Sequence, residues 1–420
     1  MPLSTSALIR ATSLENGLSV ITEHIPGLQS VSVRWLVPAG YTTEPENRLG
    51  LSVVVEELMF RGAGDLDSKA QADACDAIGM TRVIQSGSTH MTLGTTVMQQ
   101  HVAGALSLLN DMVQMPKFES GSIEPARALA LMGLESLQDD PTQRASLAAR
   151  AHHMGSPFDR TGLGTEPCIK AITRDDVASH WNHRAVSDGS VLALAGNIEH
   201  DDAVAAIAPL VQSWMGSASV PTVSGMGPRG YHHEEDDSQQ VQIVVLFDAP
   251  SESHTDCILE RFMVQVLSGG MSGRLFTEVR EKRGLCYSVN AGYATSRDFG
   301  RTSCYVGTMP DRAQESLDVL WAELHRLKSP GGAITEDEFA IAKTGLKAST
   351  IFEGESTAAR ASALAVDQFR LGKPRALDEL AAQIDAVTLD QLNEYVQRRS
   401  LAHATIQTLG PAALKAPEGV

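Results

Sequence analysis

The sequence lacks any apolar run long enough to cross a membrane. Its longest apolar stretches, such as Ser190–Ala195 within GSVLALAGN, fall far short of the roughly eighteen residues that a spanning helix needs. The opening residues, MPLSTSALIRATSLENG, also lack a charged segment followed by a continuous apolar core, so they do not resemble a secretory signal. We therefore expect no membrane segment and a cytoplasmic location.

Cysteine pairs and basic charge are also scarce. The five cysteines are odd in number, widely scattered and without a CxxC spacing, which argues for reduced thiols rather than a disulfide framework or a zinc cluster. Asp and Glu total 51 against 34 Lys and Arg, giving a net charge of −17. Nucleic acid and anionic membrane are excluded as partners because both require a basic surface, whereas basic peptides or a less acidic protein remain compatible.

What is present is an order of elements that occurs twice. Residues 16–40 read as two strands, residues 51–61 and 68–78 as helices, and residues 81–98 as a strand pair. After residue 240 a strand, a polar loop, a helix and further strands return in the same order. We interpret this as a two-fold internal repeat of α+β units.

A change of composition separates the two halves. Residues 216–240, GSASVPTVSGMGPRGYHHEEDDSQQ, are rich in Gly, Pro, Ser and charge and are typical of an interdomain linker. His232 and His233 stand beside four acidic residues there, which is a weak metal-binding pattern. A solvated linker tract is the favoured interpretation.

The stretch Gly50–Gly62, GLSVVVEELMFRG, carries the first candidate site. Val53, Glu56 and Glu57 stand at i, i+3 and i+4 and share one face of a helix. An inverted zinc-peptidase motif places His, Glu and His at this spacing, two imidazoles to hold Zn²⁺ and a carboxylate to activate water. Here only the carboxylate remains. Taken alone, the stretch is also typical of an amphipathic helix with two solvated glutamates.

Several motifs together resemble the pitrilysin/insulinase family of zinc peptidases, which includes the mitochondrial processing peptidases. The helix, NGLSVITEH, PAG with a following acid, DDP, LALAGNI and SGGMSGRLFTEVREKRGLCYSV follow the family's order over essentially the whole chain. The resemblance implies an α+β fold of two homologous domains, each a mainly antiparallel sheet packed with helices, forming half of a clam-shell chamber. The expected boundaries are 1–215, a linker over 216–240, and 241–420.

The resemblance also implies that the zinc site is lost. The family's His-x-x-Glu-His falls on Val53, Glu56 and Glu57, and its third ligand, a later glutamate, falls on Gly133. Counting back from Asp139-Asp140-Pro141 gives the same position, and an additional family glutamate falls on Ala126. No zinc is therefore expected on this chain, and without zinc Glu56 supplies little catalysis as a base.

The second half keeps what the first half loses. The family's arginine and tyrosine that bind the substrate backbone match Arg280 and Tyr287. Leu275, Phe276 and Val279 are expected to pack inward from the helix that carries Arg280. Without the family, Arg280 would read as one member of the charged run EVREKR, and Tyr287 as a sheet aromatic.

His180 and His183 form a second weak metal pattern, with an H-x-x-H spacing on a helix over residues 175–183. No third ligand presents itself, so core or surface histidines are the favoured interpretation.

These observations predict a non-catalytic, substrate-binding subunit of a heteromeric zinc peptidase. A zinc-bearing paralogous subunit would be its partner, an extended peptide its substrate, and the zinc would belong to that partner. A homodimer is compatible with the sequence. The alternatives are a purely structural subunit and, disfavoured by the missing ligands, a peptidase active on its own.

Overall fold

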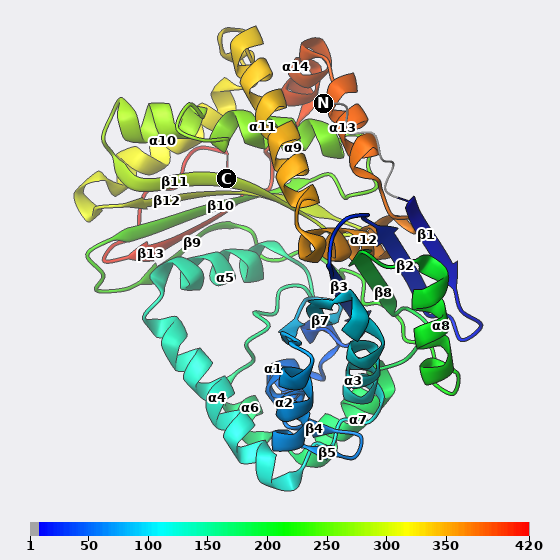
Figure 1. The fold of residues 1–420 in the computed structure, drawn as a ribbon. Helices are drawn as coiled ribbons and strands as arrows, with labels where there is room; N and C mark the ends of the chain where they lie inside the picture. The colour runs from blue at the N-terminus through cyan, green and yellow to red at the C-terminus, as the bar shows by residue number, and fades with distance from the viewer. Residues whose placement is uncertain (1–7, 420) are drawn as a thin grey trace. The chain divides into compact units, whose positions relative to one another are not determined.

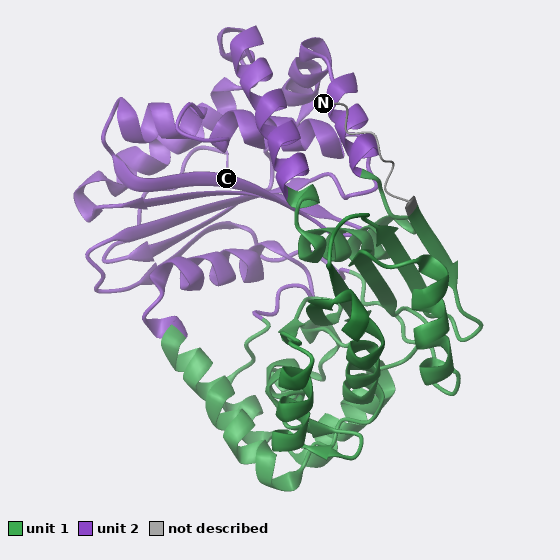
Figure 2. Ribbon diagram, in the orientation of Figure 1, with its two compact units in different colours: residues 1–136, 162–222, 353–376 green, residues 137–161, 223–352, 377–420 purple. Residues whose placement is uncertain are grey.

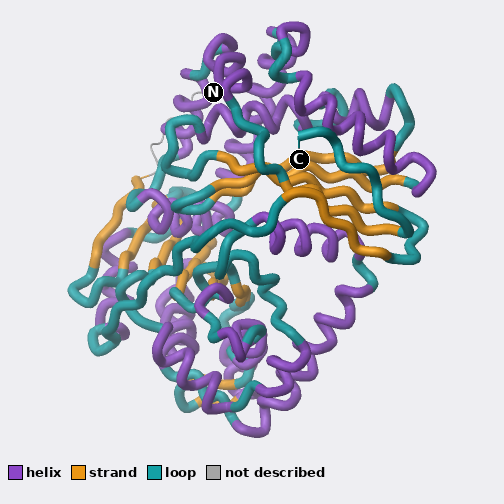
Figure 3. Tube along the Cα trace, turned by 180° about the vertical axis from the view of Figure 1, so that it is seen from behind, coloured by secondary structure: helices purple, strands orange, loops and turns teal. Residues whose placement is uncertain are grey.

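The computed structural model describes residues 8–419, which divide into two compact units (Figure 1, Figure 2). Unit 1 comprises residues 1–136, 162–222 and 353–376, and unit 2 comprises residues 137–161, 223–352 and 377–420. The strands of each unit gather in one main sheet with helices against it (Figure 3). None of the helices in the described part of the chain is long and apolar enough to cross a membrane.

The main sheet of unit 1 has the strand order β1-β2-β8-β3-β7-β6. Its strands are β1 (Leu8–Ser13), β2 (Ser19–His24), β3 (Ser30–Val37), β6 (Val83–Ser86), β7 (Met91–Met98) and β8 (Val191–Gly196), and β4 (Gly62–Ala63) pairs separately with β5 (Leu66–Asp67). The helices are α1 (Leu51–Leu58), α2 (Ser68–Ala77), α3 (Val102–Gln114), α4 (Ser120–Gln138), α6 (Glu166–Ala171), α7 (Arg174–Arg184), α8 (His200–Val211) and α12 (Thr357–Leu371). Only β2 and β8 pair in parallel within this sheet as described.

The sheet of unit 2 has the order β11-β12-β10-β13-β9. Its strands are β9 (Gly230–Glu235), β10 (Val241–Ala249), β11 (Cys286–Thr295), β12 (Gly300–Thr308) and β13 (Thr405–Gly410). The helices are α5 (Pro141–His153), α9 (Cys257–Ser268), α10 (Ala313–Arg326), α11 (Glu336–Gly354), α13 (Leu377–Ala386) and α14 (Leu389–Arg398), with a π-helical turn η4 over Phe276–Glu281.

The two sheets share one topology, which confirms the predicted α+β fold with a repeated unit. Reading from the edge strand inward, β6-β7-β3-β8-β2 in unit 1 corresponds to β11-β12-β10-β13-β9 in unit 2, and in each sheet the last of these pairs is the parallel one. β1 is an additional strand in unit 1. The rest of the pairing is antiparallel, as predicted.

Each unit receives one helix from the opposite half of the chain. α12 packs on β3 and β8 of unit 1, where Ala361, Leu364 and Ala365 join a small apolar cluster. α5 packs on β10 and β13 of unit 2 through Ala145 and Ala149. The compact units therefore do not follow the continuous ranges 1–215 and 241–420 expected from the sequence.

The linker expected over residues 216–240 contains a strand. Residues 230–235 form β9, which pairs in parallel with β13. His232 and His233 lie on this strand and are half-buried, so the solvated tract expected there is wrong for these two residues. The polar composition hid the strand because β9 is at the edge of the sheet, where one side of its backbone is unpaired.

Candidate functional site

The α1 helix begins at a glycine held by a buried acid. Gly50 has a φ of 95°, a left-handed conformation that suits glycine. The Glu44 carboxylate accepts hydrogen bonds from the backbone N–H groups of Gly50 at 2.8 Å and Ser52 at 2.7 Å. These bonds satisfy donors that a helix N-terminus leaves without intrahelical partners. They hold the first turn of α1 in place.

One face of α1 packs into the core and the other carries the predicted site positions. Leu51, Val54, Val55 and Leu58 are buried in the core of unit 1, and Val53 packs against the same core from a half-buried position. Glu56 and Glu57 are also half-buried. The helix ends at Leu58 rather than at Arg61, but the three site positions share one face, as the spacing predicts.

The Glu56 carboxylate is hydrogen-bonded to the end of a neighbouring strand. Its Oε2 accepts a hydrogen bond from the backbone N–H of Ser86, at 2.8 Å, at the end of edge strand β6. Burial raises the pKa of Glu56, the Ser86 N–H opposes that shift, and the charge of Glu57 adds to it. The carboxylate therefore anchors β6, which is a structural task separate from catalysis.

The fourth predicted position offers no metal ligand. Gly133 is exposed on α4, and a side chain built there would meet nothing within 4 Å. Ala126, at the additional family position, is fully buried on the same helix. Valine and glycine supply no donor atom and Glu56 is bound to Ser86, so these residues do not fit a zinc ion. In residues 8–419 no group of three or more His, Cys, Asp or Glu side chains is arranged to hold a metal.

Arg280 and Tyr287 lie together at the surface of unit 2. The guanidinium Cζ of Arg280 is 5.2 Å from the centroid of the Tyr287 ring and 4.9 Å from that of the Phe276 ring. Tyr287 is 81% exposed, and Arg280 is exposed as well. The sequence prediction that the two residues act as a pair is thus compatible with their geometry.

Two backbone irregularities place Arg280 and Tyr287 at the surface. Within η4, the N–H of Lys282 donates to the carbonyl of Thr277 at 2.9 Å, a π-helical spacing that occurs often at functional sites. On β11, the register with β12 shifts between Cys286 and Ser288, so Tyr287 is left out of the pairing. Such a bulge re-aims a side chain, which accounts for the exposure of Tyr287.

The sequence prediction of the packing around Arg280 was partly right. Leu275 and Val279 are fully buried, as expected. Phe276 is only half-buried and lies beside Arg280 instead of entering the core. The i, i+4 spacing of Phe276 and Arg280 was a signal that could have revealed this stacking, whereas no residue pattern marked the bulge.

The charges near Arg280 are already paired among themselves. Lys282 donates a hydrogen bond to Glu278 at 2.7 Å, and Arg283 donates one to Glu278 at 2.9 Å. Both bonds lower the pKa of Glu278, and the bond from Lys282 has the larger effect. Burial raises the pKa of Cys286 to about 11 although Arg280 opposes it. The thiol is therefore protonated at neutral pH and is not a reactive nucleophile.

The other histidine motifs lie elsewhere. His180 and His183 line an open cleft of about 580 Å³ in unit 1, together with Arg48 and Asp176. Burial, and then the charges of Arg184 and His183, lower the pKa of His180 to about 4. His180 is therefore neutral at pH 7. This cleft does not include α4 or the α1 positions that carry Glu56 and Glu57.

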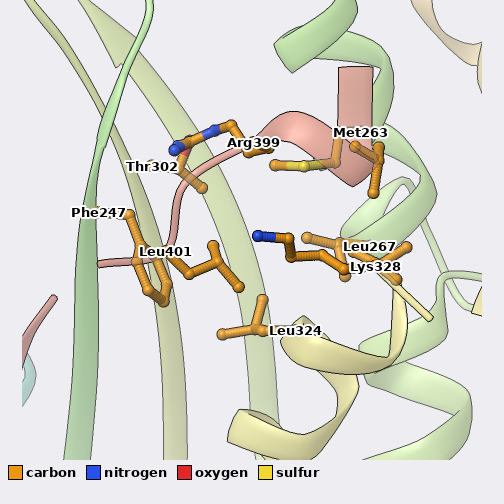
Figure 4. Close-up of a pocket in the computed structure, with 10 residues that line it drawn as sticks. Phe247, Met263, Leu267, Thr302, Leu324, Lys328, Arg399 and Leu401 are labelled. Carbon is orange, nitrogen blue, oxygen red and sulfur yellow. The ribbon is translucent and has the colours of Figure 1, made fainter. Parts of the chain in front are cut away.

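A cavity in the core of unit 2 is too small to be a site. Figure 4 shows Phe247, Met263, Leu267, Leu324 and Leu401 around it. Its volume is about 10 Å³, which holds at most one water molecule.

Comparisons with known proteins agree with this architecture. Residues 19–162 match the family described as Insulinase (Peptidase family M16), and residues 171–346 match the family described as Peptidase M16 inactive domain. An uncharacterized zinc protease of Mycobacterium leprae is 28% identical over 98% of this chain and 93% of its own length. One of Bacillus subtilis is 25% identical over 92% of this chain and 94% of its own length.

Solved structures share the fold. The crystal structure of a peptidase M16 inactive domain from Pseudomonas fluorescens has a TM-score of 0.87, at 21% identity, and covers 97% of this chain and 100% of its own. A protease from Helicobacter pylori has a TM-score of 0.84, at 17% identity, over 96% and 99% of the two chains. With the two family matches spanning most of the sequence and the topology of both sheets repeated, the chain belongs to the insulinase family of zinc peptidases, peptidase family M16.

Proposed function

We propose that this chain is a non-catalytic, substrate-binding subunit of a heteromeric zinc peptidase, and that it completes the peptide chamber of a zinc-bearing partner from the same family. One asymmetry carries the proposal. The positions of the family's metal ligands hold Val53, Glu57 and Gly133, whereas Arg280 and Tyr287 remain exposed to solvent as a pair.

In this proposal the zinc belongs to the partner, where a bound zinc polarises the scissile carbonyl and activates water. Arg280 and Tyr287 supply hydrogen-bond donors that orient an extended peptide. Orientation of a bound substrate contributes to rate without any reacting group on the orienting chain. The five free cysteines support a reducing location, and we place the complex in the cytoplasm.

Co-purification tests the proposal directly. The tagged chain is isolated from its native source, and bound proteins are identified by mass spectrometry. We expect a paralogous chain that carries His-x-x-Glu-His, and we expect peptide cleavage only when the two purified chains are mixed.

Metal analysis of the isolated chain is the accompanying test. We expect no stoichiometric zinc and no peptide cleavage, because the α1 and α4 positions lack nitrogen donors. About one zinc per chain, lost on chelation together with a cleavage activity, would overturn the proposal. A partner that assembles with the chain but cleaves peptides equally well without it would instead favour a structural role.

A further inference from the structure

Unit 1 contains an open cleft of about 580 Å³ that the proposed function does not use. It lies along helix α7, which carries the H-x-x-H spacing, and neither Glu56 nor Glu57 lines it. Its volume falls within the range of about 300–1,000 Å³ that is typical of small-molecule sites. Pro45, Leu51 and Pro221 supply apolar lining, and the polar groups come from α7, the loop before α1 and the segment after α8.

The guanidinium of Arg184 lines this cleft, and the residue is only 7% exposed. Its Nε donates a hydrogen bond to the carbonyl of Pro38 at 2.7 Å, and its Nη2 donates one to the carbonyl of Ser219 at 3.0 Å. Within residues 8–419, Arg184 forms no salt bridge and its Nη1 donates no hydrogen bond. Nη1 is not among the fully buried atoms that lack a partner, so solvent reaches it.

Arg184 is thus a buried cation without a balancing carboxylate in the described part of the chain. Buried charges are normally paired, because an unpaired charge loses its hydration without compensation. Burial lowers the pKa of Arg184 with no carboxylate to oppose the effect. After burial, the charge of Arg184 is the next cause that lowers the pKa of His180, so this imidazole stays neutral at pH 7. The other arginine of the cleft is balanced, because Arg48 pairs with Asp176 at 2.9 Å.

We propose that this cleft binds a small organic acid, either a free acid or the C-terminus of a short peptide, through a carboxylate that pairs with Arg184. A carboxylate supplies one negative charge for one unbalanced guanidinium, and hydrogen bonds between charged groups are the stronger class. A phosphate group carries about −1.5 to −2 charges near neutral pH. It fits less well, because Asp175 already lines the cleft. The apolar lining suits a ligand with an apolar body beside its carboxylate.

Isothermal titration calorimetry of the purified full-length chain tests the site with matched probes. Isovalerate and isovaleramide differ in the carboxylate, and N-acetyl-alanyl-leucine with a free or an amidated C-terminus is the corresponding peptide pair. Inorganic phosphate is the third probe. We expect the recognised carboxylate to bind about tenfold to a hundredfold more tightly than its amide, and phosphate to bind more weakly than that carboxylate. The pair with the larger difference identifies the source of the carboxylate.

Three variants separate this site from the general charge of the protein. Arg184→Met removes the charge and should bind carboxylate and amide equally. Ser179→Trp introduces an indole from an exposed lining position of α7, and it should abolish binding while both hydrogen bonds of Arg184 stay in place. Arg10→Ala removes a positive charge outside the cleft, where Arg10 pairs with Asp201, and it should retain the preference for the carboxylate.

Equal affinity for the charged and neutral members of both pairs overturns the inference. Undiminished binding by Ser179→Trp, an equal loss in Arg10→Ala, or phosphate binding as tight as the better carboxylate also overturns it. So does the absence of carboxylate binding up to about 10 mM. Urea denaturation checks that each variant is folded, and if Arg184→Met is not, Ser179→Trp and the amide probes decide. The proposed function is judged separately, by peptide cleavage with the reconstituted complex, which none of these binding measurements involves.

Discussion

Units 1 and 2 share a sheet topology but present different chemistry at their surfaces. In unit 1 the α1 face is closed, since Val53 packs against the core and Glu56 binds the end of β6. In unit 2 a π-helical turn and a β-bulge expose Arg280 and Tyr287. Two units of one topology thus differ in which side chains they expose.

The helices received from the opposite half of the chain are also held differently. On unit 1, Arg360 of α12 donates to Glu23 at 2.7 Å, and both side chains are almost completely buried. On unit 2, the end of α5 is held by histidines, with the His152 ring stacked 3.8 Å from His232 and His153 within 2.9 Å of Thr405. The α12 attachment thus includes a buried carboxylate–guanidinium pair, and the α5 attachment includes a pair of stacked imidazoles.

The largest expected effect comes from breaking the α12 attachment. Arg360→Ala leaves the Glu23 carboxylate buried without its cation, and the loss of one partner from a buried pair costs about 3–5 kcal/mol. Urea denaturation followed by tryptophan fluorescence measures it, because Trp35, Trp181 and Trp214 all lie in unit 1.

A double variant serves as the control. Arg360→Met with Glu23→Gln removes both charges together and should recover most of the stability, since no uncompensated charge remains. A loss below about 1 kcal/mol in Arg360→Ala would show that the pair does not hold α12.

The next effect concerns the exposed pair of unit 2. Arg280→Ala should lower kcat/KM of the reconstituted peptidase by about tenfold to a hundredfold, because a hydrogen bond from a charged donor is worth roughly 1.5–3 kcal/mol. Tyr287→Phe removes only a hydroxyl and should cost about 0.5–1.5 kcal/mol. Complex formation is checked by size-exclusion chromatography, with Arg283→Ala as the matched control. Unchanged kinetics in an assembled Arg280→Ala, Tyr287→Phe variant would leave a structural subunit as the better explanation.

The sequence predicted the repeated α+β fold and the placement of the site positions on elements, because helical spacing and strand alternation are local properties. It could not predict which sheet receives α5 or α12, since an apolar face such as that of Ala145 and Ala149 indicates burial without naming the surface that covers it. The exposure of Tyr287 was equally hidden, because a bulge depends on the register of two strands. The hydrogen bond from Ser86 to Glu56 joins residues thirty positions apart, and helical spacing carries no information about such a contact.

Substitution of Glu56 in unit 1 is the counterpart of the Arg280 substitution in unit 2, with a smaller expected effect. Glu56→Ala removes the acceptor of the Ser86 N–H and should cost about 0.5–1.5 kcal/mol of stability. Glu56→Gln keeps an acceptor oxygen and should cost less. Peptide cleavage by the reconstituted complex should be unchanged in Glu56→Gln, and a large loss of kcat there would mean that this carboxylate takes part in the chemistry.

The smallest effect is a pH response confined to α5. Burial, and then the neighbouring His232, lower the pKa of His152, although its hydrogen bond with Gln407 opposes the shift. A histidine whose pKa is lower in the folded state stabilises that state fully above its unfolded pKa of about 6.5, and the contribution is lost as the pH falls from there through the folded pKa. Acid should therefore loosen α5 on unit 2.

Other charges at α5 limit the size of this response. Arg144 binds Glu234 and Asp236 at the start of the helix, away from the stacked rings. Burial alone would raise the pKa of Asp248, but bonds from His153 and Arg229 hold it well below its usual range, so Asp248 stays ionised beside the end of α5. Its negative charge, at the same end of α5 as the stacked rings, opposes the effect of adding positive charge there.

Hydrogen exchange of the backbone amides measures the difference between the two helices. Protection of α5, corrected for the intrinsic pH dependence of exchange, should fall relative to that of α12 when the pH is lowered through about 6.5. His232→Phe keeps an aromatic ring against His152 but removes the imidazole whose charge helps to lower the pKa of His152, so the pH response should shrink in that variant. If α5 and α12 lose protection together, or if His232→Phe responds like the parent chain, the stacked imidazoles are not the cause of an acid-sensitive attachment of α5. If only α5 responds, the stacked imidazoles of His152 and His232 are the acid-sensitive part of its attachment.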